Sequence, residues 1–168
     1  MIVVVVSDTH MPRMSKKLPD RLVRELKKAD AVIHAGDWTK LSVYEELSTF
    51  APTDGVAGNN DGPDIIDRFG YRKILTFEGC RIGVVHGHGI GKRPNTEERA
   101  LEAFNGIKLE AVIFGHSHIP VHRLVGSTHV FNPGSPTDKR RQLRYSFGIM
   151  EIIAGKLRAK HIFFDDKS

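Results

Sequence analysis

The hydrophobic pattern of the chain begins with a strand. Ile2 to Ser7 opens with five β-branched apolar residues in succession, which is typical of a strand buried on both faces inside a parallel sheet. Shorter apolar runs at Ala31 to Ala35 and at Ala111 to Phe114 predict strands of the same kind. Thr53 to Ala57 predicts a weaker strand, because a proline precedes it and a glycine interrupts it.

Apolar residues at helical spacing separate these strands. Pro19 to Lys28 predicts a helix with proline at its first position, where proline is tolerated, and Leu41 to Phe50 predicts a second helix. Asp64 to Tyr71 is expected to be a connection with a little helix. A third full helix is predicted to begin at Asn95, because Glu98 follows it at the spacing of a capping box.

The remaining segments alternate between apolar and polar residues and turn at glycines, which predicts antiparallel strands. A hairpin around Glu78 and Gly79 joins the first two of them. The predicted strands are Lys73 to Phe77, Arg81 to Val85, Val121 to Val125, Thr128 to Asn132, Ser146 to Ile153 and Lys156 to Phe164.

These elements predict a mixed α/β fold. Too many strands lack a crossover helix for a single doubly wound sheet, so we expect a four-layer α/β/β/α sandwich of two mixed sheets with helices outside. A chain of 168 residues is of ordinary size for one core, and residues 1–168 are expected to form a single domain.

The sequence predicts neither a membrane span nor an export signal. No apolar run approaches the ~20 residues of a membrane span. Met1 leads straight into a strand, with no basic region before it and no cleavage site after it. We therefore expect a cytoplasmic protein without a membrane partner. The single cysteine, Cys80, cannot form an internal disulfide, which agrees with a reducing compartment.

The chain is basic, with a formal net charge of +5 and a pI near 9.4. The excess is uneven, with lysines between Lys16 and Lys28 and a second cluster between Lys139 and Arg144. Such clusters suit an anionic partner, either nucleic acid or a phosphorylated substrate, but they are also common on a solvated face.

Metal-ligand residue types follow five of the predicted strands. The carboxyl ends of strands in open α/β sheets are where reactive groups collect. Glycines at positions 36, 58, 87, 89 and 115 flank these residues and allow the backbone to approach a ligand closely. Each residue alone has an ordinary structural explanation, as a loop cap or a packed histidine, but together they favour a metal site. The candidates are Asp8, His10, Asp37, Asn59, His86, His116 and His118, with Asn60, Asp61 and His88 beside them.

The donor set indicates the metal chemistry. It is rich in oxygen and nitrogen and has no thiolate, which favours a hard or borderline cation such as Mn²⁺, Fe, Ni²⁺ or Zn²⁺. Seven ligands are too many for one ion with an open position, and they suit two ions that share a carboxylate. Two such ions, about 3.5 to 4 Å apart, clamp the attacking and leaving oxygens of a phosphoryl displacement. The predicted reaction is hydrolysis of a phosphate ester.

The motifs D-x-H, G-D, G-N-x-D, H-G-H and G-H-x-H occur in this order between Asp8 and His118. As a set they resemble the calcineurin-like metallophosphoesterase superfamily, and more closely its small single-domain prokaryotic phosphodiesterases. N-P-G-S, at Asn132 to Ser135, also resembles that branch and is expected to return to the site.

The resemblance implies a cofactor of two divalent ions, with Mn²⁺ favoured, a dimer or higher homo-oligomer, and attack on phosphorus by a metal-bridging hydroxide. It assigns Asp8, His10 and His118 to the first ion, Asn59, His86 and His116 to the second, and Asp37 as the bridge.

Position 60 departs from the pattern of many larger members, which read G-N-H-D or G-N-H-E. That histidine is taken to assist the leaving group, whereas asparagine cannot act as a general acid near neutral pH. Diesters with good leaving groups should then be favoured, unless His88 takes this part. Asn60 could instead donate a hydrogen bond to a phosphate oxygen. The catalytic candidates are therefore Asn59, Asn60 and His88.

Three functions remain open. The first is a phosphodiesterase that acts on small or nucleotide-like diesters. The second is a nuclease of the same chemistry, supported only by Lys139 to Arg144, although 168 residues leave no room for the extra DNA-binding segments of such nucleases. The third is an inactive scaffold, similar to the phosphoesterase-like subunit of the retromer coat. Every ligand position is intact, which argues against the scaffold.

Overall fold

The computed structural model describes residues 1–89 and 95–168. Its helices are α1 (Asp20–Leu26), α2 (Leu41–Ser48), α3 (Pro63–Phe69) and α4 (Thr96–Ala103). One set of strands comprises β1 (Ile2–Val6), β2 (Ala31–His34), β3 (Thr53–Gly55), β9 (Tyr145–Ile153) and β10 (Lys156–Phe164). The other comprises β4 (Arg72–Phe77), β5 (Cys80–Val85), β6 (Ala111–Ile113), β7 (Val121–Val125) and β8 (Thr128–Asn132).

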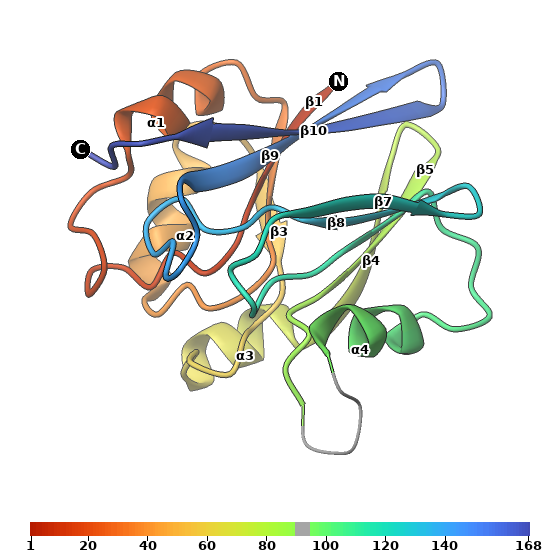
Figure 1. Cartoon of the computed structure of the whole chain (residues 1–168), viewed down its shortest axis with the longest axis horizontal. Helices are drawn as coiled ribbons and strands as arrows, with labels where there is room; N and C mark the ends of the chain where they lie inside the picture. The colour runs from red at the N-terminus through yellow and green to blue at the C-terminus, as the bar shows by residue number, and fades with distance from the viewer. Residues whose placement is uncertain (90–94) are drawn as a thin grey trace.

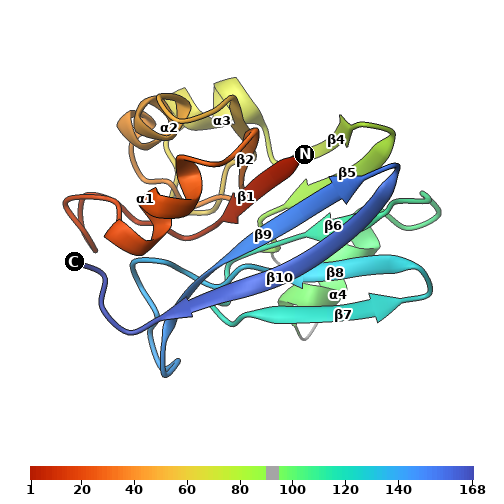
Figure 2. The same cartoon turned by 90° about the horizontal axis from the view of Figure 1, so that it is seen from above.

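The strands form two five-stranded sheets, in the orders β10-β9-β1-β2-β3 and β4-β5-β6-β8-β7. Figures 1 and 2 show α1, α2 and α3 on the outer face of the first sheet and α4 against the second. Both sheets are mixed: β1, β2 and β3 run parallel, as do β5, β6 and β8, while the β4–β5, β7–β8 and β9–β10 hairpins are antiparallel. The predicted α/β/β/α sandwich is confirmed.

β1 is buried on both faces, as its apolar run predicts. Val4 and Val6 pack with Leu22 and the other residues beneath the helices, whereas Val3 and Val5 belong to the core between the two sheets. Full burial of such side chains is worth about 1.5–3 kcal/mol each. A third apolar cluster lies between the second sheet and α4, so the four layers enclose three layers of core.

Many element ends differ from the prediction by one or two residues; α1, for example, begins after Pro19, which is its N-cap, and ends at Leu26. Two of these differences have a clear physical cause. The segment expected to be a connection with a little helix is α3, which begins with Pro63 after Gly62 and ends at Gly70, whose φ is 69°. Proline at the start and glycine just past the end are the usual helix boundaries. β3 ends at Gly55, two residues early, because the Ala57 N–H turns away to the Gly70 carbonyl, 2.7 Å distant.

The carboxyl ends of the parallel strands meet at one edge of the sandwich. β1, β2 and β3 end there in the first sheet, and β5 and β6 end there in the second. This edge therefore gathers the five loops in which the sequence places its candidate ligands. No helix within residues 1–89 and 95–168 is long and apolar enough to cross a membrane.

Candidate metal centre

The Asp8 carboxylate is held in one orientation at the end of β1. Its Oδ2 accepts hydrogen bonds from the Ser7 hydroxyl, at 2.7 Å, and from the His116 backbone N–H, at 3.0 Å. The second bond joins two loops 108 residues apart in sequence. Because Oδ2 is occupied, Oδ1 is the oxygen that remains for a ligand.

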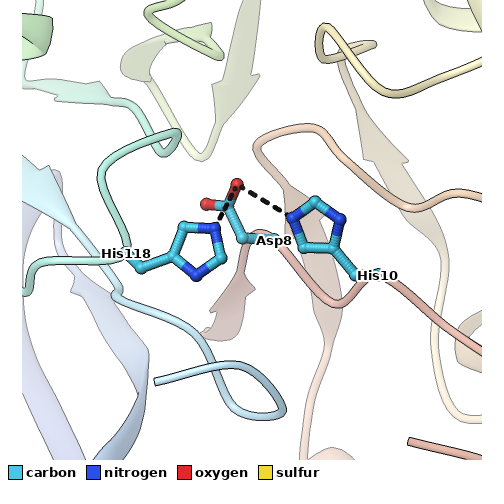
Figure 3. Close-up of side chains that lie close together, drawn as sticks. All are labelled: Asp8, His10 and His118. Atoms are coloured by element: carbon cyan, nitrogen blue, oxygen red, sulfur yellow. Dashed lines mark ion pairs between the residues drawn. The ribbon is translucent and has the colours of Figure 1, made fainter. Parts of the chain in front are cut away.

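Three imidazoles surround Asp8 Oδ1. The Nε2 atoms of His118, His86 and His10 lie 3.4, 3.6 and 3.8 Å from it. Figure 3 shows Asp8 between His10 and His118, with one nitrogen of each ring turned toward the carboxylate. These side chains lie in the loops that follow β1, β5 and β6, so both sheets contribute to the cluster.

Asp37, at the end of β2, adds a second carboxylate. Its Oδ2 lies 3.4 Å from His10 Nε2 and 3.3 Å from His86 Nε2. Asn60 donates to both of its oxygens, from the backbone N–H to Oδ1 and from the side-chain amide to Oδ2, each at 2.9 Å. The structure therefore places the Asn60 amide on Asp37.

Backbone carbonyls fix which ring nitrogen faces the cluster. His86 Nδ1 donates to the Ala35 carbonyl at 2.8 Å, and His118 Nδ1 donates to the Asp138 carbonyl at 2.6 Å. A carbonyl can only accept, so Nδ1 carries the hydrogen and Nε2 is directed at the carboxylates. Outer hydrogen bonds of this kind orient the imidazoles of metal sites.

Four of these inward atoms are buried and have no hydrogen-bond partner among the described residues: Asp8 Oδ1 and the Nε2 atoms of His10, His86 and His118. A buried polar atom left unpaired costs about 1–3 kcal/mol. Clustering four of them is therefore unfavourable unless a further group joins them. Carboxylate oxygen and imidazole nitrogen are the donors of a divalent cation, so the residues present fit one.

The ligand atoms form two overlapping groups that could hold an ion, with donor atoms within 4.8 Å of one another. One group is Asp8, His10 and His118, and the other is Asp8, Asp37 and His86. Asp8 belongs to both groups, and Asp37 Oδ2 also contacts a histidine of each. The two carboxylates together therefore link the groups, whereas the resemblance assigns this role to Asp37 alone.

The other candidates lie at the exposed side of the cluster. His116 Nδ1 is 3.1 Å from Asn59 Oδ1, and its ring centroid is 5.2 Å from that of His86. His88 is half-buried, with its ring 5.4 Å from that of His86 and edge-on to Tyr71. The fold thus brings all seven candidate ligands, and His88, to one edge.

Two buried carboxylates around His86 dominate the electrostatics. Burial lowers the pKa of His86, but the negative charges of Asp8 and Asp37 beside it outweigh this effect and raise the pKa to about 9. Burial acts to raise the pKa of Asp37, but His86 and the two donors of Asn60 hold it well below its usual range. Without metal, the His86 imidazolium thus occupies the position between the carboxylates, and a cation would displace its proton.

Asp61 holds two of the ligand loops together. Its Oδ2 accepts from the backbone N–H groups of Asp37, at 2.8 Å, and Gly58, at 2.7 Å, and its Oδ1 accepts from Thr39 N–H at 2.8 Å. This explains the aspartate of G-N-x-D as a buried acceptor for backbone donors.

Further supports were not identified from the sequence. His34 Nδ1 accepts a hydrogen bond from the Gly36 N–H, so the ring hydrogen is on Nε2, which donates to Thr9 Oγ1 at 3.0 Å. Thr9 is the middle residue of the D-x-H motif. Ser135 and Thr137 donate to the carbonyls of Asp8 and Thr9, at 2.8 and 2.6 Å. The expected return of N-P-G-S to the site is thus observed.

The ligand backbone is also strained. Five candidate ligands have positive φ angles between 44° and 68°, which non-glycine residues rarely adopt. Such residues cluster at functional sites, where the surrounding structure enforces the conformation. A methyl group on Gly115 would lie 1.9 Å from Ser7 Oγ, and one on Gly58 would lie 2.2 Å from Asp37 Oδ1. The five residues are Asp8, His10, Asp37, His116 and His118.

The two sheets of the sandwich thus bring together, at their strand ends, an aspartate–histidine cluster that could hold divalent cations. The model of the calcineurin-like phosphoesterase superfamily domain matches residues 1–155. The chain belongs to this superfamily, whose members use divalent metals.

Curated relatives carry corresponding names. A probable metallophosphoesterase of Methanothermobacter thermautotrophicus is 33% identical over 142 residues, which are 83% of this chain and 80% of the relative. A phosphodiesterase of Methanocaldococcus jannaschii is 28% identical over 147 residues, 77% of this chain and 81% of that protein.

Among solved structures, wild-type Vps29 of Entamoeba histolytica, crystallised with Zn²⁺, has a TM-score of 0.75. It is 22% identical, with 97% of this chain and 99% of that one covered. At this identity the likeness shows a common fold.

Proposed function

We propose that the protein is a dinuclear metal-dependent phosphodiesterase for small or nucleotide-like phosphodiesters. The observation that carries the proposal is the set of four buried, unpaired ligand atoms contributed by both sheets. The phosphodiesterase name of the M. jannaschii relative supports the choice of a diester.

In this proposal seven residues hold two divalent ions. Asp8, His10 and His118 bind the first, and His86, His116 and Asn59 bind the second, with Asp37 between them. His116 Nδ1 and Asn59 Oδ1 both face the exposed side, 3.1 Å apart, where the second ion would lie. Mn²⁺ suits this mixture of oxygen and nitrogen donors, as do Ni²⁺, Fe and Zn²⁺.

Bound ions of this kind supply Lewis acidity for the phosphoryl oxygens and lower the pKa of a water to near neutrality. The residues of the chain do the positioning. Ser7 and the His116 N–H keep Asp8 Oδ1 pointed inward, and the Ala35 carbonyl keeps His86 Nε2 on the cluster. Preorganised groups of this kind supply most of the stabilisation needed in phosphoryl transfer.

Asn60 and His88 are the two candidates for assisting the leaving group. The amide of Asn60 reaches Asp37 Oδ2 and offers a donor but no acidic proton. His88 is the other candidate, since its ring lies between those of Tyr71 and His86. We propose that Asn60 orients Asp37 and the phosphate, and that diesters with good leaving groups react best.

The test is hydrolysis of bis-p-nitrophenyl phosphate beside p-nitrophenyl phosphate. Chelator-stripped protein is assayed with and without Mn²⁺ or Ni²⁺, as wild type and as Asp37→Ala. Metal-dependent cleavage of the diester, little cleavage of the monoester and none by the variant would support the proposal. A preference for the monoester would refute the diester assignment and indicate that His88 replaces the missing acid.

The scaffold alternative is supported by the likeness to Vps29, at an identity that shows the fold alone. A scaffold would bind two ions and turn over no phosphoester with any of them. The same assay therefore separates the two functions.

The nuclease alternative is supported by the basic segment from Lys139 to Arg144. It directly follows Asp138, whose carbonyl accepts from His118, so the segment begins beside the metal cluster. Metal-dependent cutting of single- or double-stranded DNA, weakened by Arg141→Gln, would favour this alternative over a small diester.

A further inference from the structure

A groove runs from the metal cluster along the start of α4. Its volume is about 430 Å³, and His116 and Ser117 are among the residues that line it. His116 also faces Asn59 across 3.1 Å at the cluster. A phosphate ester bound at the cluster would thus have the groove directly beside it, and pockets of about 300–1,000 Å³ hold molecules of drug size.

One wall of the groove is apolar. Phe114, Ile119 and Val121 form it, and Ile119 is 47% exposed although it is a large aliphatic residue. The Ile119 N–H bonds to Ser117 Oγ, which fixes the backbone beneath this wall independently of the side chain. An exposed isoleucine in a concave surface next to a reactive site is suited to contact a ring.

The opposite wall is polar but carries little net charge. Glu97 accepts from Arg123 through both carboxylate oxygens, so these two charges compensate each other. Asn95 caps α4 by accepting from the Glu98 N–H at 2.8 Å and donating to its carboxylate at 3.2 Å. Arg99 adds one positive charge, in contact with other groups. A second phosphate would need several free donors, and the residues that the structure describes on this wall do not assemble them.

We propose that this groove binds one ester group of the diester, and that this group is an uncharged ring of aryl or nucleoside size. The proposal rests on the proposed function of the metal cluster. Ile119 then determines specificity: it contacts the ring, and the ions bind the phosphate. A small alkyl group such as methyl would leave the groove empty, so a methyl ester would gain no binding energy from it.

The test compares methyl, phenyl and thymidine 5′ esters of p-nitrophenyl phosphate on the Mn²⁺-loaded protein. All three share the same leaving group, so differences between them report on the other ester group. Ile119→Gln keeps the size of the side chain and makes it polar. The matched control is Leu124→Gln. Leu124 lies on β7, is exposed like Ile119 and does not line the groove.

Wild type should prefer the phenyl and thymidine esters. Ile119→Gln should raise KM for these two esters about four- to fifteenfold, the effect of losing the burial of one or two methylene groups. It should leave kcat and the methyl ester unchanged, and Leu124→Gln should change nothing. An equal effect of Ile119→Gln on all three esters, or none on any, would overturn the proposal.

A binding measurement keeps this result separate from the proposed function. If wild type hydrolyses no diester, the proposed function fails. Calorimetric titration with phenylphosphonate and methylphosphonate then decides about the groove. Tighter binding of the phenyl compound that is lost in Ile119→Gln supports the groove, and equal binding of the two compounds overturns it.

Discussion

Asp61 offers the sharpest test of how the ligand loops are held, because it is expected to contact no ion itself. Its carboxylate accepts three backbone N–H bonds, from Asp37, Thr39 and Gly58. Asp61→Asn keeps the shape of the side chain and replaces one acceptor oxygen with an NH₂ group. That group must face a backbone donor, whichever way the amide turns.

The magnitude follows from counting these bonds. In its better orientation the asparagine keeps the bonds from Asp37 and Gly58 and loses the one from Thr39. A hydrogen bond to a charged group contributes about 1.5–3 kcal/mol. Burial raises the pKa of Asp61, so the neutral asparagine recovers part of the desolvation cost. We expect a net loss of about 2 kcal/mol in the free energy of unfolding, and metal affinity lower by about tenfold.

The assay is urea unfolding of chelated protein, followed by calorimetric titration with Mn²⁺. Asp67→Asn removes a charge from the exposed face of α3 and serves as the control, with a change in stability within about 0.5 kcal/mol. If Asp61→Asn matches this control in both measurements, Asp61 does not position the loops and the reasoning is wrong.

Three other perturbations have defined outcomes. Gly115→Ala should lower the free energy of unfolding by about 1–3 kcal/mol and weaken Mn²⁺ binding, because the added methyl group would lie 1.9 Å from Ser7 Oγ. The control is Gly62→Ala, whose methyl group would have no atom nearer than 3.5 Å. It should change neither quantity in the same urea and calorimetric measurements. The folded-state pKa of His86, about 9, exceeds its ordinary value of 6.5. Protonated His86 therefore stabilises the metal-free protein fully below pH 6.5, and about 3 kcal/mol of stability is lost as the pH rises through 9. Urea unfolding that shows constant stability between pH 6.5 and 9 would contradict this prediction. Asn60→His should reduce the dependence of kcat/KM on leaving-group pKa in a series of aryl diesters, and an unchanged slope would show that position 60 does not govern protonation.

The fold could be predicted from the sequence where local pattern and tertiary structure agree. The β-branched run of β1 has both faces buried, and its alternate valines fill two different cores. α3 was underestimated although Pro63 and Gly70 mark its two ends, since its seven residues carry only a short apolar stripe.

The candidate ligands could be singled out because they follow strands, and four of them, Asp37, Asn59, His86 and His116, stand beside a glycine. Their orientation could not be predicted, since it depends on contacts between distant segments. Ser135 supports Asp8 from 127 residues away, and Asp138 orients His118 through a backbone carbonyl that has no sequence signature. The positive φ angles of the ligands likewise follow from packing of the loops and not from residue preference.

We propose that two ions act together at this edge of the sandwich. It is tested most directly by adding Mn²⁺ in measured equivalents to chelator-stripped protein and following hydrolysis of bis-p-nitrophenyl phosphate at each step. Negligible activity is expected with one equivalent bound, and full activity once the second equivalent binds. Full activity after the first equivalent, or none with two bound, would contradict it.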